Sequence, residues 1–178
     1  EVEEHVEMAK FDENGLDALS EEQARSILQE SGAWTAIRTR PYSKTPEVDH
    51  EPAGIFVKAI DTDPLSANPA VIINHKTQAF QDGLKVLAKL TRGKVYVCQH
   101  ENAELPDLPQ TNEGSDKIVT KKFSGKHPAG LVGTHIHNIL PVSAERSVWH
   151  LNYQDVIAIG MLFATGKRYC DRIIALSG

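Results

Sequence analysis

Several features that would assign this 178-residue chain to a particular class of protein are missing from it. Its only two cysteines, Cys98 and Cys170, lie far apart, so we expect no disulfide framework and favour a reducing compartment. No apolar run reaches the length of a membrane-spanning helix, and no signal peptide is recognisable. The net charge of −5 argues against a general nucleic-acid-binding protein.

The motifs of common cofactor and catalytic sites are missing as well. No Gly-x-Gly-x-x-Gly follows a predicted strand, and neither a P-loop nor a Gly-x-Ser-x-Gly elbow occurs. The histidines form no zinc-binding pattern, since His135 and His137 would point to different faces of a helix. Gly130 and Gly133 either expose the N–H groups of a helix N-terminus to a ligand or let that helix pack closely on a sheet, and we favour close packing.

The segments that are present alternate between strand and helix patterns. Hydrophobic residues make up 40% of the chain and charged residues 24%, which is typical of a globular domain. Ser20 and Gln23 form a capping box for a helix. The patterns predict helices over 20–31, 77–93, 127–140 and 153–166, strands over 54–60, 94–99, 147–152 and 172–177, and an irregular excursion over 101–122.

This alternation predicts an α/β fold with a mostly parallel sheet and helices on both faces. Ligands of such sheets bind at the carboxyl ends of the strands. The segment "DTDPLSANP" follows the first predicted strand there and carries Asp61 and Asp63. These two residues are either a carboxylate pair for acid–base chemistry or cation binding, or plain turn-forming residues before Pro64, which we favour.

Five segments, taken in order, resemble the A subunit of the bacterial sodium-translocating NADH:quinone reductase. They are "SGAWTAIRTRPYSKTP", "IFVKAIDTDPLSANPAVII", "GKVYVC", "HPAGLVGTHIH" and "WHLNYQDVIAIGMLFATG", and together they extend over nearly the whole chain. The resemblance implies that residues 15–178 are the central α/β domain of that subunit. This domain is Rossmann-like and similar in fold to the flavin-binding subunit of respiratory complex I and to the C subunit of the Rnf complex.

The resemblance also implies a longer protein around this chain, which begins with glutamate rather than methionine. Residues 1–14 would be the end of a preceding domain or an edge strand. A β-rich N-terminal region and a ubiquitin-like C-terminal region would flank the α/β domain.

The segment 31–46 stands where the flavin-binding relatives carry a glycine-rich loop that ends in Phe-Pro-Thr and surrounds the FMN phosphate. Bulky side chains replace those glycines here, so we expect no FMN in this domain. We expect Trp34 to fill the former flavin cleft and the arginines to line its mouth. The candidate cofactor-binding residues, for a quinone or as remnants of the flavin cleft, are Trp34, Arg38, Arg40, Tyr42, Asp61 and Asp63.

The function that the resemblance implies is that of a complex which passes electrons from NADH to a quinone and exports sodium. This domain is expected to bind neither FMN nor NADH, to be inactive when isolated, and to help form a ubiquinone pocket. Its expected partners are the other subunits, including membrane subunits, which would hold it at the cytoplasmic side of the bacterial inner membrane without a span of its own. A functional flavin or dinucleotide-binding domain and a purely structural docking module remain the alternatives.

Overall fold

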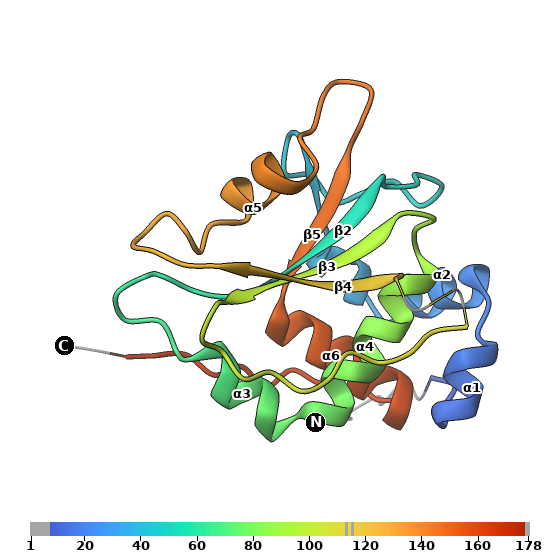
Figure 1. Ribbon diagram of the computed structural model, residues 1–178. Coiled ribbons are helices and arrows are strands. Elements are labelled where there is room, and N and C mark those ends of the chain that lie inside the picture. The colour runs from blue at the N-terminus through green and yellow to red at the C-terminus, as the bar shows by residue number, and fades with distance from the viewer. Residues whose placement is uncertain (1–7, 113, 115, 177–178) are drawn as a thin grey trace.

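A mixed five-stranded sheet lies at the centre of the computed structural model, which describes residues 8–176 apart from 113 and 115 (Figure 1). The strand order is β1-β5-β2-β3-β4. Strands β5, β2, β3 and β4 are parallel, and β1 pairs with β5 in the antiparallel direction. The strands are Arg38–Arg40 (β1), Gly54–Ala59 (β2), Lys94–His100 (β3), Ile118–Phe123 (β4) and Val148–Asn152 (β5). The prediction of a mostly parallel α/β sheet is therefore confirmed.

Helices cover both faces of this sheet, as predicted. Helix α5 lies above the sheet in Figure 1, and α3, α4 and α6 lie below it. Helices α1 and α2 contribute to the same hydrophobic core as α4 and α6. The helices are Glu13–Ala18 (α1), Glu21–Glu30 (α2), Pro69–His75 (α3), Thr77–Lys89 (α4), Val132–Ile139 (α5) and Tyr153–Thr165 (α6), with a 3-10 turn at Ala33–Ala36 (η1).

Strand β2 explains why a continuous apolar run marks the centre of the sheet. Ile55 and Val57 point into the core beneath the sheet, whereas Phe56 points into the smaller core under α5. Successive side chains of a strand point to opposite faces, so a strand that is covered on both sides is apolar at nearly every position. The strands predicted at 54–60, 94–99 and 147–152 are confirmed on this basis.

Helices α4 and α6 approach each other through two glycines. A Cβ atom at Gly160 would lie 1.8 Å from the carbonyl oxygen of Ala79, and one at Gly83 would lie 2.1 Å from that of Val156. Both backbones therefore require residues without a side chain at these points. The predicted capping box of α2 at Ser20 is also confirmed, and a second capping box, at Asn152, begins α6.

Three predicted elements differ from the structure. The strand predicted at 172–177 is wrong over its described part, because residues 172–176 form no strand and Ile173 bonds instead to the side chain of Gln154. The excursion predicted at 101–122 ends in β4, whose exposed polar residues hide its strand pattern. The helix predicted at 127–140 begins only at Val132, so Pro128 lies before it rather than in its first turn.

The N-terminal prediction falls mainly outside the described residues, because these begin at Met8. The backbone N–H groups of Met8 and Phe11 donate to carbonyl groups at the end of α6, those of Gly166 and Phe163. Helix α1 then begins at Glu13. The last two residues of the segment 1–14 are therefore helical, whereas an edge strand was one of the two alternatives predicted for that segment.

Candidate functional site

The point at which the strand order changes direction lies between β2 and β5. The chain leaves β2 towards β3 and β4 on one side, and β5 returns to the other side of β2. In open α/β sheets the ligand pocket lies outside the carboxyl ends of the strands at such a point. Here the loop 61–68 follows β2, and the first turn of α6 follows β5 directly at Tyr153.

A cavity of about 520 Å³ lies at this position. Its apolar wall comes from the loop 61–68 and from the C-terminal segment, with Pro64, Leu65, Ala67, Ile173, Ile174 and Ala175. Its polar groups are those of Asp61, Asp63, Ser66, Asn152, Tyr153 and Gln154. We call it the switch-point pocket. Apolar walls with a few convergent polar groups are typical of a small-molecule site.

One ion pair and one histidine–carboxylate contact hold the loop 61–68 at the mouth of the pocket. Lys58 Nζ lies 2.9 Å from Asp61 Oδ2, and His127 Nδ1 lies 3.4 Å from Asp63 Oδ1. Burial raises the pKa of Asp61, but the contacts with Lys58 and with the Asp63 backbone outweigh burial and leave it below its usual value. The loop also accepts a hydrogen bond at Thr62 Oγ1 from the backbone N–H of Gly130, at 3.0 Å.

The first turn of α6 supplies two ionisable groups, Tyr153 and Asp155, whose pKa is raised, in contrast to that of Asp61. Burial raises the pKa of the Tyr153 hydroxyl, and the charge of Asp61 adds to this effect. Burial also raises the pKa of Asp155, although Arg172, 3.1 Å away, offsets part of it. A hydroxyl that keeps its proton and an ionised carboxylate give the lining of the pocket a hydrogen-bond donor and a charged acceptor.

Trp34 is buried, as expected, but it does not lie with Asp61 and Asp63. Its ring meets that of Trp149 edge to face, with centroids 5.4 Å apart, and its Nε1–H donates to the Pro46 carbonyl at 2.9 Å. The guanidinium of Arg25 lies over both rings. The predicted grouping is therefore wrong for Trp34, which fills the core between α2 and β5 instead of lining the switch-point pocket.

Arg38, Arg40 and Tyr42 also lie away from this pocket, because residues 38–40 form β1 at the edge of the sheet. The two arginines share one face of β1, because they are two residues apart, and they pair with His150 and Val148. Tyr42 follows in an exposed turn, with 77% of its surface accessible. Of the six candidate residues, the structure thus brings only Asp61 and Asp63 together at the switch-point pocket.

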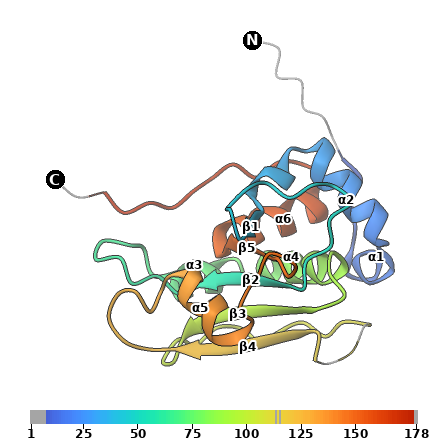
Figure 2. The same ribbon diagram turned by 90° about the horizontal axis from the view of Figure 1, so that it is seen from above.

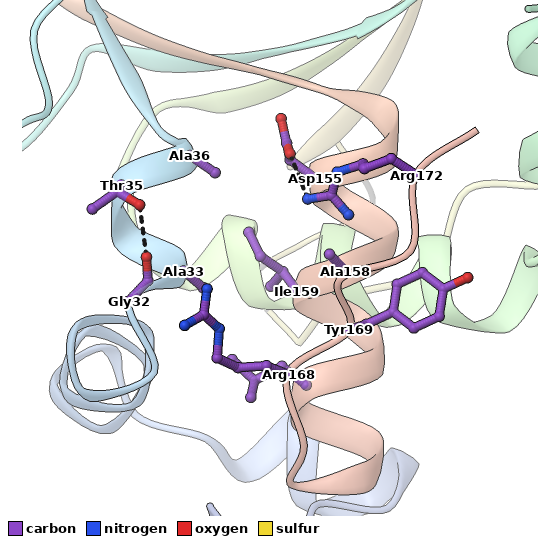
Figure 3. A pocket seen from close by; sticks show the side chains of 11 residues that line it. Gly32, Ala33, Thr35, Ala36, Asp155, Ala158, Ile159, Arg168, Tyr169 and Arg172 are labelled. Atoms are coloured by element: carbon purple, nitrogen blue, oxygen red, sulfur yellow. Dashed lines mark hydrogen bonds and ion pairs between the residues drawn. The ribbon is translucent and has the colours of Figure 1, made fainter. Parts of the chain in front are cut away.

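A second cavity, of about 160 Å³, separates η1 from α6 (Figure 3). Arg172 points across α6 to Asp155, and Arg168 extends towards Gly32 and Ala33. No residue of the C-terminal segment was predicted to line a site, although this segment lines both cavities, and residues 172–177 were predicted as a strand.

Two other kinds of site are not found in the part of the chain that the structure describes. No group of three or more His, Cys, Asp or Glu side chains there is arranged to hold a metal ion. None of the helices among those residues has the length and hydropathy of a membrane-spanning helix.

The fold and the pocket define an open-sheet α/β domain whose candidate ligand site lies at the carboxyl ends of its parallel strands. The chain belongs to the family described as the NqrA second alpha/beta domain, whose model matches residues 19–168.

Three similar proteins carry one name, that of the A subunit of the Na(+)-translocating NADH-quinone reductase. The protein from Shewanella amazonensis is 57% identical over 97% of this chain and 37% of its own length. Those from Histophilus somni and Photorhabdus laumondii are 50% and 54% identical, each over 98% of this chain and 38% of the relative. This chain therefore spans less than half the length of the curated relatives it matches, and the relatives are subunits of an oxidoreductase complex.

Proposed function

We propose that this domain is part of a subunit of the sodium-translocating NADH:ubiquinone reductase and supports quinone reduction coupled to sodium export. The names of the relatives support the complex, and their identity over nearly the whole chain supports the transfer of that name. The domain attaches to the other subunits, including membrane subunits, and lies peripherally at the cytoplasmic side of the inner membrane. The isolated domain is inactive, because the proposal places neither FMN nor NADH in it.

The strand order supports a Rossmann-like origin. When β2, β3, β4 and β5 are counted as strands 1 to 4, the parallel part of the sheet has the order 3-2-1-4. Dinucleotide-binding sheets begin with this order and hold their ligand at the point where it reverses. The switch-point pocket occupies that place.

The segment 31–46 does not fit an FMN phosphate. A phosphate cradle needs several free backbone N–H groups that a ligand can approach closely. Here the N–H groups of Thr35 and Ile37 donate to the carbonyls of Gly32 and Trp34, and the Trp34 side chain is buried in the core. We therefore propose that the domain binds neither FMN nor NADH.

The switch-point pocket is instead suited to the uncharged head of ubiquinone. The quinone ring needs an apolar slot and one or two hydrogen-bond donors for its carbonyl oxygens. Leu65 and Ile174 supply apolar wall, and the Tyr153 hydroxyl and the Asn152 side-chain N–H groups are the donors. The observation that carries this proposal is one cavity whose lining combines apolar walls with a proton-bearing Tyr153 and with Asp61.

Photo-labelling of the complete reductase with an azido-ubiquinone tests the site. The expected labelled peptides contain residues 61–68 or 171–176. Leu65→Asp should lower this labelling at least about tenfold, because a charge in an apolar slot costs several kcal/mol. Val48→Asp is the matched control, since Val48 is similarly exposed but does not line the pocket.

Each alternative function predicts a different experimental result. Labelling confined to other subunits would favour a purely structural docking module. A yellow purified subunit that releases flavin on denaturation would favour a functional flavin domain and would contradict the proposal.

A further inference from the structure

Strand β4 is the outermost strand on its side of the sheet (Figure 2). Within the part of the chain that the structure describes, it pairs with β3 alone. It is six residues long, whereas the opposite edge strand β1 has only three residues. A long edge strand offers a row of backbone groups to an incoming strand.

The hydrogen bonds to β3 show which backbone groups point outward. The N–H of Val95 donates to the carbonyl of Lys117, and the N–H of Glu101 donates to that of Phe123, each at 2.9 Å. Backbone groups alternate in direction along a strand, so the odd-numbered residues of this stretch bond to β3. The N–H and C=O groups of Thr120 and Lys122 therefore point away from the sheet, and both side chains are exposed.

The charge around this edge favours one kind of partner. Residues 117–126 contain four lysines and no carboxylate, although the whole chain has a net charge of −5. The exposed side chains of Lys121 and Lys122 point to opposite faces of β4, so they flank a paired strand on both sides. Pairing with β4 of a second copy would bring lysines against lysines, which disfavours self-association.

We propose that the free edge of β4 pairs with an extended, acidic segment of a partner protein, which adds a strand to the sheet. The outward groups of Thr120 and Lys122 supply the backbone hydrogen bonds, and Lys121 and Lys122 select carboxylates. The half-buried Val119 lies on the face that carries α5, beside Lys121, and accepts an apolar side chain of the added strand there. This inference rests on the docking role in the proposed function and is independent of the quinone pocket.

Hydrogen exchange of the complete subunit, free and in the assembled reductase, tests the pairing. The amides of Thr120 and Lys122 should exchange about tenfold or more slowly after assembly, because the added strand accepts their hydrogen bonds. The amide of Lys121, which faces β3, is the internal control and should be protected in both states. A reductase that assembles while both outward amides exchange as in the free subunit would overturn this inference and leave the proposed function intact.

Two variants separate the backbone contact from the charge contact. Thr120→Pro removes one outward N–H and is tolerated at that edge, whereas Thr120→Ala keeps the N–H and is its control. The proline variant should weaken assembly about tenfold, and the alanine variant should assemble normally.

If the proline variant fails to fold, charge reversal at the lysines tests the same pairing. The double substitution Lys121→Glu and Lys122→Glu should weaken assembly at least about tenfold at low salt. The same reversal at the exposed Lys44 and Lys94 is the control and should have little effect. Normal assembly of the Lys121 and Lys122 variant would overturn the inference.

Discussion

At the scale of a single residue, Gly160 allows α4 and α6 to pack closely. A Cβ atom there would meet the backbone of α4 at Ala79 and also lie 2.9 Å from the Gly83 nitrogen. Neither neighbour is the end of a flexible side chain, so neither can move aside without shifting a helix. Gly133, in α5, is the opposite case, because among the described residues a Cβ at that position would have no atom within 4 Å beyond its chain neighbours and the backbone of its own helix.

Substitution of these two glycines by alanine should therefore have opposite effects. Gly160→Ala should lower the free energy of unfolding by about 3 kcal/mol, the cost of overpacking a rigid contact. Gly133→Ala should raise it by about 0.5–1 kcal/mol, because alanine loses less backbone entropy in a helix. Urea unfolding of both variants measures the difference. A Gly160→Ala protein as stable as the native one would contradict the observed helix contact.

At the scale of elements, the antiparallel addition of β1 to β5 brings two arginines next to a histidine. Arg38 pairs with His150, and Arg40 lies two residues further along the same face. Burial and these two positive charges lower the pKa of His150 from 6.5 to about 4. Its Nε2 atom is buried without a hydrogen-bond partner, so the folded state holds the neutral ring.

The stability of the protein should consequently fall on acidification. Between pH 6.5 and about 4, the unfolded chain binds a proton at His150 and the folded chain does not. The free energy of unfolding should fall by at most about 1.4 kcal/mol per pH unit from this group. His150→Gln should flatten this part of the pH profile in urea unfolding. Burial also lowers the pKa of His135, so the free energy of unfolding of the variant should still decrease to some extent as the pH falls. Parallel profiles for the variant and the native protein would contradict this explanation.

The elements that could be predicted from the sequence are those whose pattern is local. The Ser20 capping box and the apolar run of β2 depend on neighbouring residues, and both were predicted correctly. Strand β4 was missed because half of its positions face solvent, which hides the apolar pattern of a strand. The segment 172–176 was mistaken for a strand because its apolar run is typical of a buried strand, whereas Ile173, Ile174 and Leu176 are exposed in the structure. Their structures depend on distant partners that no local pattern records.

The residues of the candidate site also differ in whether the sequence alone could place them. Asp61 and Asp63 could be placed at the carboxyl end of a strand, since the fold class fixes that edge. Trp34 could be predicted as buried but not as a partner of Trp149, because that contact requires knowing that residues 38–40 add to β5. The residues of the C-terminal segment could not be placed without the fold.

At the scale of the whole molecule, the C-terminal segment forms part of the wall of both cavities. Ile173 and Ile174 line the switch-point pocket, and Arg168 and Arg172 line the cavity beside η1. The Gln154 side chain holds the segment in the manner of a neighbouring strand. Its Nε2–H donates to the Ile173 carbonyl and its Oε1 accepts from the Ile173 N–H, each at 2.9 Å.

Gln154→Ala should release this segment and open the wall of the switch-point pocket. Loss of two hydrogen bonds of about 1 kcal/mol each should raise the population of the open form about tenfold or more, and tryptic cleavage after Arg172 should rise equally. Gln81→Ala is the matched control, because Gln81 also bonds to a distant carbonyl, that of Asp107, outside both cavities. Cleavage after Arg172 should be unchanged in that control. If it is also unchanged in Gln154→Ala, then the ion pair of Arg172 with Asp155 alone holds the segment, and the strand-like role of Gln154 is wrong.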